Sequence, residues 1–63
     1  MLTVFVRVKV KPGLEEDYVA AAKALVKSSR KELENITYDF CKISGVDNEY
    51  CFVERWESHS SLE

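Results

Sequence analysis

A strand-like run at residues 49–57, EYCFVERWE, places a carboxylate between two large aromatic side chains. Phe52, Glu54 and Trp56 follow one another at every second position, so in a strand they point to the same face of a sheet. A carboxylate in such surroundings could act as a general base on a phenolic or quinol hydroxyl. The indole of Trp56 could stack on a planar aromatic substrate. We therefore predict Glu54 and Trp56 as candidate catalytic residues.

Both side chains also have a purely structural interpretation. A tryptophan at the end of a strand can anchor the following helix against the sheet, and large aromatic side chains usually belong to a core. Glu54 can pair with an arginine or lysine near a sheet edge or an interface. The sequence leaves both interpretations open.

A second strand-like run, ITYDFCKI at residues 36–43, is separated from the first by the turn-forming residues SGVDN. The two runs predict an antiparallel hairpin. We prefer the register that opposes Phe40 to Phe52, because a slip by one residue would mix aromatic side chains with charged ones on both faces. The aromatic face of this hairpin then carries Ile36, Tyr38, Phe40, Phe52, Glu54 and Trp56. Tyr38, Phe40 and Phe52 are therefore candidate substrate-binding residues.

The N-terminal half predicts a strand and a helix that support this hairpin. Residues 2–11 alternate between apolar and polar side chains, which is typical of a half-buried strand. Pro12 ends the strand because it has no N–H for a ladder. A helix is predicted over residues 14–31, with acidic residues in its first turn and basic residues in its last. Its apolar stripe consists of Leu14, Tyr18, Ala21, Ala22 and Leu25.

The C-terminal residues resemble the start of another helix. Ser58 or Ser60 could cap it, and residues 60–63 fit the S-x-x-E capping pattern. One helical turn gains little after the cost of nucleation. We therefore expect a single α+β domain over residues 1–63: a ferredoxin-like β-α-β-β unit that lacks most of helix two and all of strand four. Its first strand would be an open edge, so we expect an unstable or oligomeric chain.

Composition and charge exclude several classes of protein. A net charge of −2 without a basic face gives no reason to expect a nucleic-acid partner. The chain has no apolar run of about 18 residues for crossing a bilayer, and no secretory leader, which favours a cytoplasmic location. Cys41, Cys51 and His59 lack metal-ligand spacing, so we predict neither a metal nor a cofactor. The two cysteines oppose each other in the preferred register, where buried free thiols are favoured over a disulfide.

Three stretches, taken together, resemble the antibiotic biosynthesis monooxygenase domain of the dimeric α+β barrel superfamily. They are VKVKPGLEEDYVAAAKALVKSSRKE, ITYDF and FVERWES, in the order and spacing of that family. The resemblance implies a ferredoxin-like subunit that pairs its sheet with a second copy to form a barrel. It also implies a range of activities: cofactor-independent oxidation of quinols and polyketide aromatics, haem degradation, and processing of small signalling molecules.

The family pattern also narrows the expected function. Its haem-degrading branch uses an asparagine in strand one, the tryptophan that Trp56 matches, and a later helical histidine. This chain has Phe5 and Arg7 where that asparagine would lie, and His59 comes too early, so haem degradation is not expected. The resemblance implies a cofactor-independent monooxygenase acting on a small aromatic or quinol-like compound, as a homodimer or higher oligomer paired through the sheet, with Arg7 and Arg55 at the interface. The alternative is a non-catalytic small-ligand-binding or dimerisation module on the same scaffold.

Overall fold

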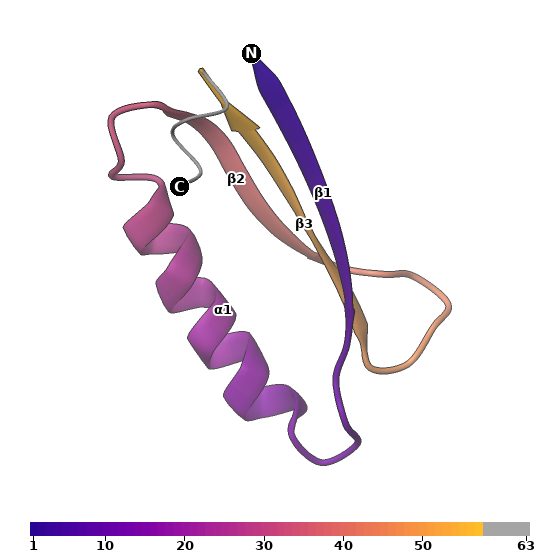
Figure 1. Ribbon diagram of the computed structural model, residues 1–63. Coiled ribbons are helices and arrows are strands. Elements are labelled where there is room, and N and C mark those ends of the chain that lie inside the picture. The colour runs from indigo at the N-terminus through magenta and orange to yellow at the C-terminus, as the bar shows by residue number, and fades with distance from the viewer. Residues whose placement is uncertain (58–63) are drawn as a thin grey trace.

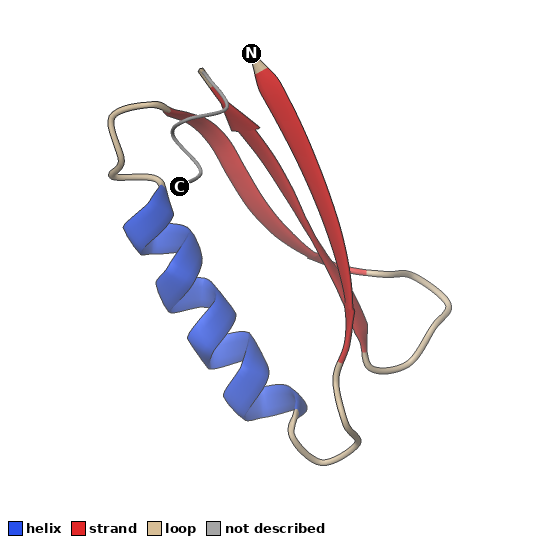
Figure 2. Cartoon of the chain, viewed as in Figure 1, coloured by secondary structure: helices blue, strands red, loops and turns tan. Residues whose placement is uncertain are grey.

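This computed structural model describes residues 1–57 of the chain. Three strands and one helix, joined by short loops, form this part (Figure 1). They are β1 (Leu2–Lys9), α1 (Glu15–Ser29), β2 (Asn35–Lys42) and β3 (Glu49–Trp56). The sheet is antiparallel with the order β1-β3-β2, and α1 lies on one of its faces (Figure 2). The expected β-α-β-β order is confirmed. The helix start predicted after Glu57, with His59, lies outside the described residues.

The connection from β1 to α1 depends on one glycine. Gly13 has a φ of 91°, in the left-handed region that favours glycine, and its N–H donates to the Glu15 side chain. The Leu14 N–H donates to the Lys11 carbonyl at 3.1 Å, which closes the turn before the helix begins. Three acidic residues occupy the first turn of α1 and Lys27 lies in its last, so both ends complement the helix dipole.

The register of the β2–β3 hairpin is the predicted one. Phe40 opposes Phe52, and the pairing continues without a break from Thr37 to Lys42. An irregularity between Asn35 and Thr37 interrupts it at the start of β2. Ile36 falls in this irregularity and is 44% exposed, so the prediction that it shares the buried aromatic face is wrong.

The helix contacts the sheet through a stripe that only partly matches the predicted one: Tyr18 and Ala22 are confirmed, whereas Ala21 is exposed. Its buried residues are Ala22, Val26 and Ser29, and the half-buried Tyr18 extends the same stripe by one turn. Leu14 and Leu25, which we expected in the core, are 51% and 48% exposed. Ala22, at 4% exposed, is the most deeply buried residue of the helix and lies in the core cluster with Phe52 and Trp56.

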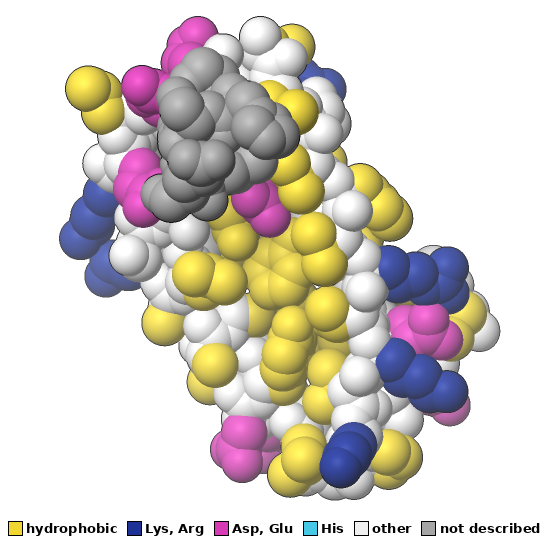
Figure 3. All heavy atoms as spheres, in the orientation of Figure 1, with side chains coloured by type: hydrophobic (Ala, Val, Ile, Leu, Met, Phe, Trp, Pro, Cys, Tyr) yellow, Lys and Arg dark blue, Asp and Glu magenta, His cyan; other side chains and the backbone are white. Residues whose placement is uncertain are grey.

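The helix does not cover the sheet evenly. It lies on the β2 side, and hydrophobic side chains gather in the strip between α1 and β1 (Figures 1 and 3). Val4 and Val8 pack against the core from β1, whereas Val6 is 39% exposed. Val6 and Leu25 thus lie outside the core cluster to which Val4, Phe40 and Phe52 belong.

Two substitutions on neighbouring helix positions distinguish the predicted stripe from the observed one. Val26→Ala should lower the free energy of unfolding by about 1 kcal/mol, because it removes buried methyl groups and leaves a small cavity. Leu25→Ala should change it by less than about 0.5 kcal/mol, because this side chain is largely in solvent. Urea denaturation followed by circular dichroism measures both. A larger loss for Leu25→Ala would contradict the observed orientation of the helix.

Candidate functional site

The two predicted catalytic residues are in direct contact. The indole Nε1–H of Trp56 donates to Glu54 Oε1 at 3.0 Å, and both side chains are buried, with 4% and 9% of their surfaces exposed. They lie on β3, the central strand, and alternation directs both toward the helix. A strand with neighbours on both sides and a helix above leaves little room for water, so the carboxylate must find its partners within the protein.

Tyr38 supplies a second polar partner for this carboxylate. It lies directly opposite Glu54 across the hairpin, and its hydroxyl forms hydrogen bonds with the side chains of Glu54 and Ser29. Burial raises the pKa of Tyr38 above its usual value of 10.0, and the negative charge of Glu54 raises it further. The hydrogen bond from Ser29 acts in the opposite direction. Tyr38 is therefore a neutral phenol near pH 7 and donates to Glu54.

The predicted substrate-binding residues form one aromatic layer with Trp56. The Tyr38 ring meets Phe52 and Trp56 edge-on, with centroids 5.9 and 6.3 Å apart. The Phe40 and Phe52 centroids are 4.9 Å apart. Such pairs add attraction beyond the area that they bury. The structure thus brings all five predicted site residues into one cluster of contacts.

Two further aromatic residues in this layer were not among the predicted site residues, although Tyr18 was predicted on the apolar stripe of the helix. Tyr50 stacks on Phe40 with centroids 5.2 Å apart, and Tyr18 of α1 lies 6.2 Å from both rings. The position of Tyr50, two residues before Phe52 on the same strand, is the signal that could have identified it. For Tyr18 the signal is its place one helical turn before Ala22.

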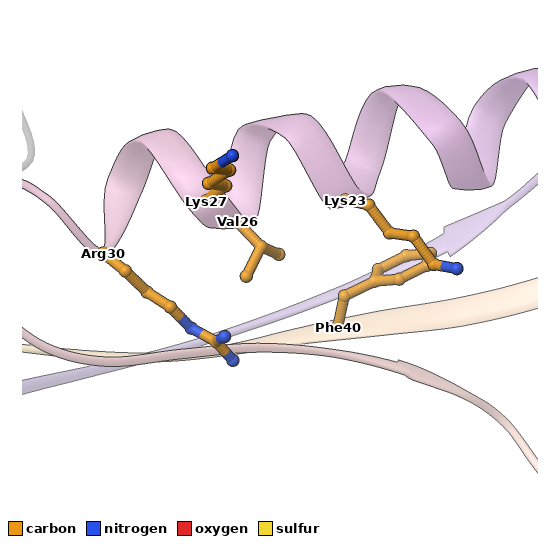
Figure 4. Close-up of a pocket in the computed structure, with 5 residues that line it drawn as sticks. All are labelled: Lys23, Val26, Lys27, Arg30 and Phe40. Atoms are coloured by element: carbon orange, nitrogen blue, oxygen red, sulfur yellow. The ribbon is translucent and has the colours of Figure 1, made fainter.

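A hollow of about 390 Å³ opens beside the aromatic layer, between α1 and β2 (Figure 4). Figure 4 shows Val26 pointing from the helix toward the sheet and the Phe40 ring lying below Lys23. Arg30 donates from Nε to the Tyr38 carbonyl at 3.0 Å and from a terminal nitrogen to Asp39 at 3.1 Å. The hollow therefore has an apolar floor and a cationic rim. Phe40 is the predicted site residue that it shares with the aromatic layer.

The sheet face opposite α1 has a different character. Phe5 is 64% exposed there, and Arg7 pairs with Glu49 at 2.8 Å. Cys41 and Cys51 are free thiols; Cys51 is half-buried but Cys41 is exposed, so the expectation that both are buried is wrong. The reason is that, among the described residues, Cys41 lies on an edge strand and no second layer covers its face of the sheet. Burial raises the pKa of Cys51, and the neighbouring Cys41 raises it further.

Other features of the described residues bear on ligands and membranes. Within residues 1–57, no three acidic, cysteine or histidine side chains are close enough to hold a metal ion together. No helix in this part of the chain has the length and apolar character to cross a membrane.

The hydrogen bonds of Tyr38 predict a specific response to alkaline pH. A phenol whose pKa is raised by folding contributes stability that is complete below the unfolded pKa of 10.0 and is lost as pH rises through the folded pKa. Tyr38→Phe should cost about 1 kcal/mol at neutral pH, where the hydrogen bonds are lost. Above pH 10.0 its free energy of unfolding should fall less steeply than that of the wild type.

Urea denaturation on both sides of pH 10.0 measures this difference in slope. Tyr18→Phe is the control, because it leaves the contact between Tyr38 and Glu54 in place and should keep the wild-type slope. Equal slopes for Tyr38→Phe and the wild type would show that the phenol is not held in this way.

Comparison with known proteins places the chain in a family. The model of the antibiotic biosynthesis monooxygenase family matches residues 1–63. "Putative monooxygenase YcnE" of Bacillus subtilis (strain 168) is 30% identical over 63 residues, which are 100% of this chain and 66% of that protein. "Uncharacterized protein sll1783" of Synechocystis sp. (strain ATCC 27184 / PCC 6803 / Kazusa) is 32% identical over 56 residues, or 89% of this chain and 38% of that protein. The chain thus spans less than two-thirds of each relative.

Solved structures show the same fold. A crystal structure described as an antibiotic biosynthesis monooxygenase superposes with a TM-score of 0.92 at 24% identity, over 98% of this chain and 65% of that one. The crystal structure of PA3566 from Pseudomonas aeruginosa gives a TM-score of 0.89 at 25% identity, over 95% of this chain and 61% of that one. The β-α-β-β arrangement is therefore the ferredoxin-like fold that the resemblance implied, and the chain belongs to the antibiotic biosynthesis monooxygenase family.

Proposed function

We propose that this protein is a cofactor-independent monooxygenase acting on a small aromatic or quinol-like compound. Membership of the family supports an oxygenase, and one observation supports the chemistry: Glu54 is buried beneath an aromatic layer with two hydrogen-bond donors, Trp56 and Tyr38. A carboxylate in this position can exchange one donor for the hydroxyl of a substrate without losing its hydrogen bonds. The exchange would place a base against the proton that it removes.

The proposed reaction needs little from the protein beyond binding, orientation and exclusion of water. Glu54 removes the hydroxyl proton of the substrate and leaves an oxyanion whose negative charge is shared with a carbon of the ring. Dioxygen adds to that carbon, and the resulting peroxide takes the proton back from Glu54 to become a hydroperoxide. Where that carbon also carries a hydrogen, the hydroperoxide loses water and leaves a new carbonyl group. One oxygen atom ends in the product and the other in water, and all the electrons that reduce dioxygen come from the substrate. The neutral Tyr38 hydroxyl would orient the substrate oxygen.

The strip between α1 and β1 is the entry route that fits this proposal. It lies over the central strand, which carries Glu54 and Trp56 (Figures 1 and 3). Val6 of β1, which opposes Phe52, is 39% exposed. A flat apolar substrate entering there would replace water on these side chains and reach the aromatic layer from its open side.

A second candidate function is a non-catalytic small-ligand-binding or dimerisation module. The close packing of the aromatic layer favours this non-catalytic function. Tyr38, Phe52 and Trp56 are only 7%, 6% and 4% exposed, and they fill the core as structural residues would. On this alternative, the cationic hollow at Phe40 is the better place for a small ligand. The same fold can serve both functions, so turnover must decide between them.

Oxygen uptake with a panel of quinols and anthrone-type phenols tests the enzyme directly. We expect uptake by the wild type, a loss of about 10²-fold or more for Glu54→Gln, which removes the base, and a smaller loss for Trp56→Phe. Glu57→Gln is the matched control, because that carboxylate is exposed at the end of the same strand region. No uptake by folded protein, or full activity of Glu54→Gln, would exclude the proposed reaction.

We also infer that two copies pair through the sheet face opposite α1. This face mixes apolar and charged side chains, and no second layer covers it within the described chain. Phe5 is 64% exposed on it, next to its cross-strand partner Val53. Arg7 and Arg55 flank these side chains, and arginine is enriched at protein interfaces.

Analytical ultracentrifugation tests this assembly. We expect the wild type to sediment as a dimer or larger species and Phe5→Glu to shift toward the monomer, because the variant loses the large apolar side chain of this face and must bury a charge in its place. Leu33→Glu changes a side chain that is 99% exposed in the connection between α1 and β2, and should leave the assembly unchanged. A monomeric wild type would contradict the inference.

A further inference from the structure

The sheet face opposite α1 brings the two cysteines of the chain together. Cys41 of β2 and Cys51 of β3 are direct cross-strand partners, and both are free thiols. Strand alternation places them on the face away from Phe40 and Phe52, so neither belongs to the aromatic cluster. They are therefore a pair of thiols for which the proposed oxygenase reaction has no use.

The backbone distance between the two residues suits a disulfide. The Ile43 N–H donates to the Glu49 carbonyl at 3.0 Å, so residues 43 and 49 form a hydrogen-bonded pair. Hydrogen-bonded pairs recur at every second position of an antiparallel ladder, and Cys41 and Cys51 lie two positions from Ile43 and Glu49. They therefore form a hydrogen-bonded pair too, and the Cα atoms of such a pair are about 5.5 Å apart. Disulfides join Cα atoms about 4.4–6.8 Å apart.

Closing the bond requires a small local movement. Opposed Cβ atoms in a sheet are about 4.5–5.5 Å apart, whereas a disulfide holds them about 3.8 Å apart. β2 is an edge strand within the described sheet, so it can approach β3 without displacing another strand. A disulfide that draws two strands together stores strain, and strained disulfides are the more easily reduced ones.

The two thiols occupy unequal environments. Cys41 is exposed, whereas Cys51 is half-buried between Cys41 and its other cross-strand partner, Arg7. The pKa of Cys51 is raised first by burial and then by the charge and hydrogen bond of Cys41, while Arg7 acts in the opposite direction. A small disulfide from solution therefore reaches Cys41 first. Cys51 is then the neighbouring thiol that can attack the mixed disulfide formed on Cys41.

We propose that Cys41 and Cys51 form a reversible disulfide by exchange with a low-molecular-weight disulfide such as oxidised glutathione. The Cys41 thiolate attacks one sulfur of the small disulfide, whose S–S bond breaks and releases one small thiol. The Cys51 thiolate then attacks the Cys41 sulfur and releases the second small thiol. The two cysteines lose two electrons and two protons in total, and the small disulfide is reduced to two thiols.

The site is accessible only when this sheet face is open. The dimer inferred above would cover it, so the reaction should be measured on both the wild type and Phe5→Glu. Slower reaction of the wild type would mean that pairing of the sheets protects the thiols. The chemistry itself is judged on Phe5→Glu, which keeps the face open.

Intact-protein mass spectrometry after incubation with oxidised glutathione tests the proposal. We expect Phe5→Glu protein to lose two hydrogen atoms and carry no lasting glutathione adduct, and dithiothreitol to restore its original mass. Adding Cys51→Ser should trap one glutathione on Cys41, because no second thiol can displace it. Adding Cys41→Ser instead should slow the reaction by roughly tenfold, because the remaining thiol is half-buried with a raised pKa.

Two outcomes would overturn the proposal. One is a stable glutathione adduct on a chain that retains both cysteines, which would mean that the sulfur atoms cannot reach each other. The other is a disulfide that forms only between chains, visible as a covalent dimer on non-reducing gels. A double variant with both cysteines changed to serine should show no mass change and serves as the blank.

Discussion

The pairing of β2 with β3 opposes Phe40 to Phe52, and the two faces of the sheet follow from this register. Because side chains alternate along a strand, a shift of one residue would move Glu54 and Trp56 away from the helix and bring Cys51 beneath it. The buried polar cluster, the aromatic layer and the thiol pair are therefore three consequences of one alignment. The irregularity at Ile36 lies outside the paired stretch and leaves this alignment intact.

The buried carboxylate of Glu54 is the costly feature of the core. A charge removed from water requires hydrogen-bond donors, and Trp56 and Tyr38 supply them from the same strand and from the opposed one. Ser29 extends this hydrogen-bond network to the helix, so the network connects the helix layer to the sheet layer. The same arrangement serves stability and the proposed chemistry, because donors that satisfy a carboxylate can be exchanged for a substrate hydroxyl.

Within residues 1–57, the small sheet and its one helix leave apolar side chains uncovered in two places. One is the strip between α1 and β1, and the other is the face that carries Phe5. A domain of this size buries a smaller share of its surface than a larger one, so additional contacts have a large effect on its stability. Pairing of two copies through the sheet would cover the second surface and shield the thiol pair, which connects assembly to the redox chemistry proposed for Cys41.

The sequence by itself determined the strands, the hairpin register and the five predicted residues of the aromatic cluster, because alternation with a period of two leaves few arrangements of Phe52, Glu54 and Trp56. It did not determine the rotation of α1. Leu25 and Val26 are both apolar neighbours, and only packing against the sheet decides which is buried. The displacement of Ile36 and the placement of the Tyr38 hydroxyl between Ser29 and Glu54 were likewise decided by the tertiary structure. Each depends on contacts between segments far apart in the chain, which local periodicity does not record.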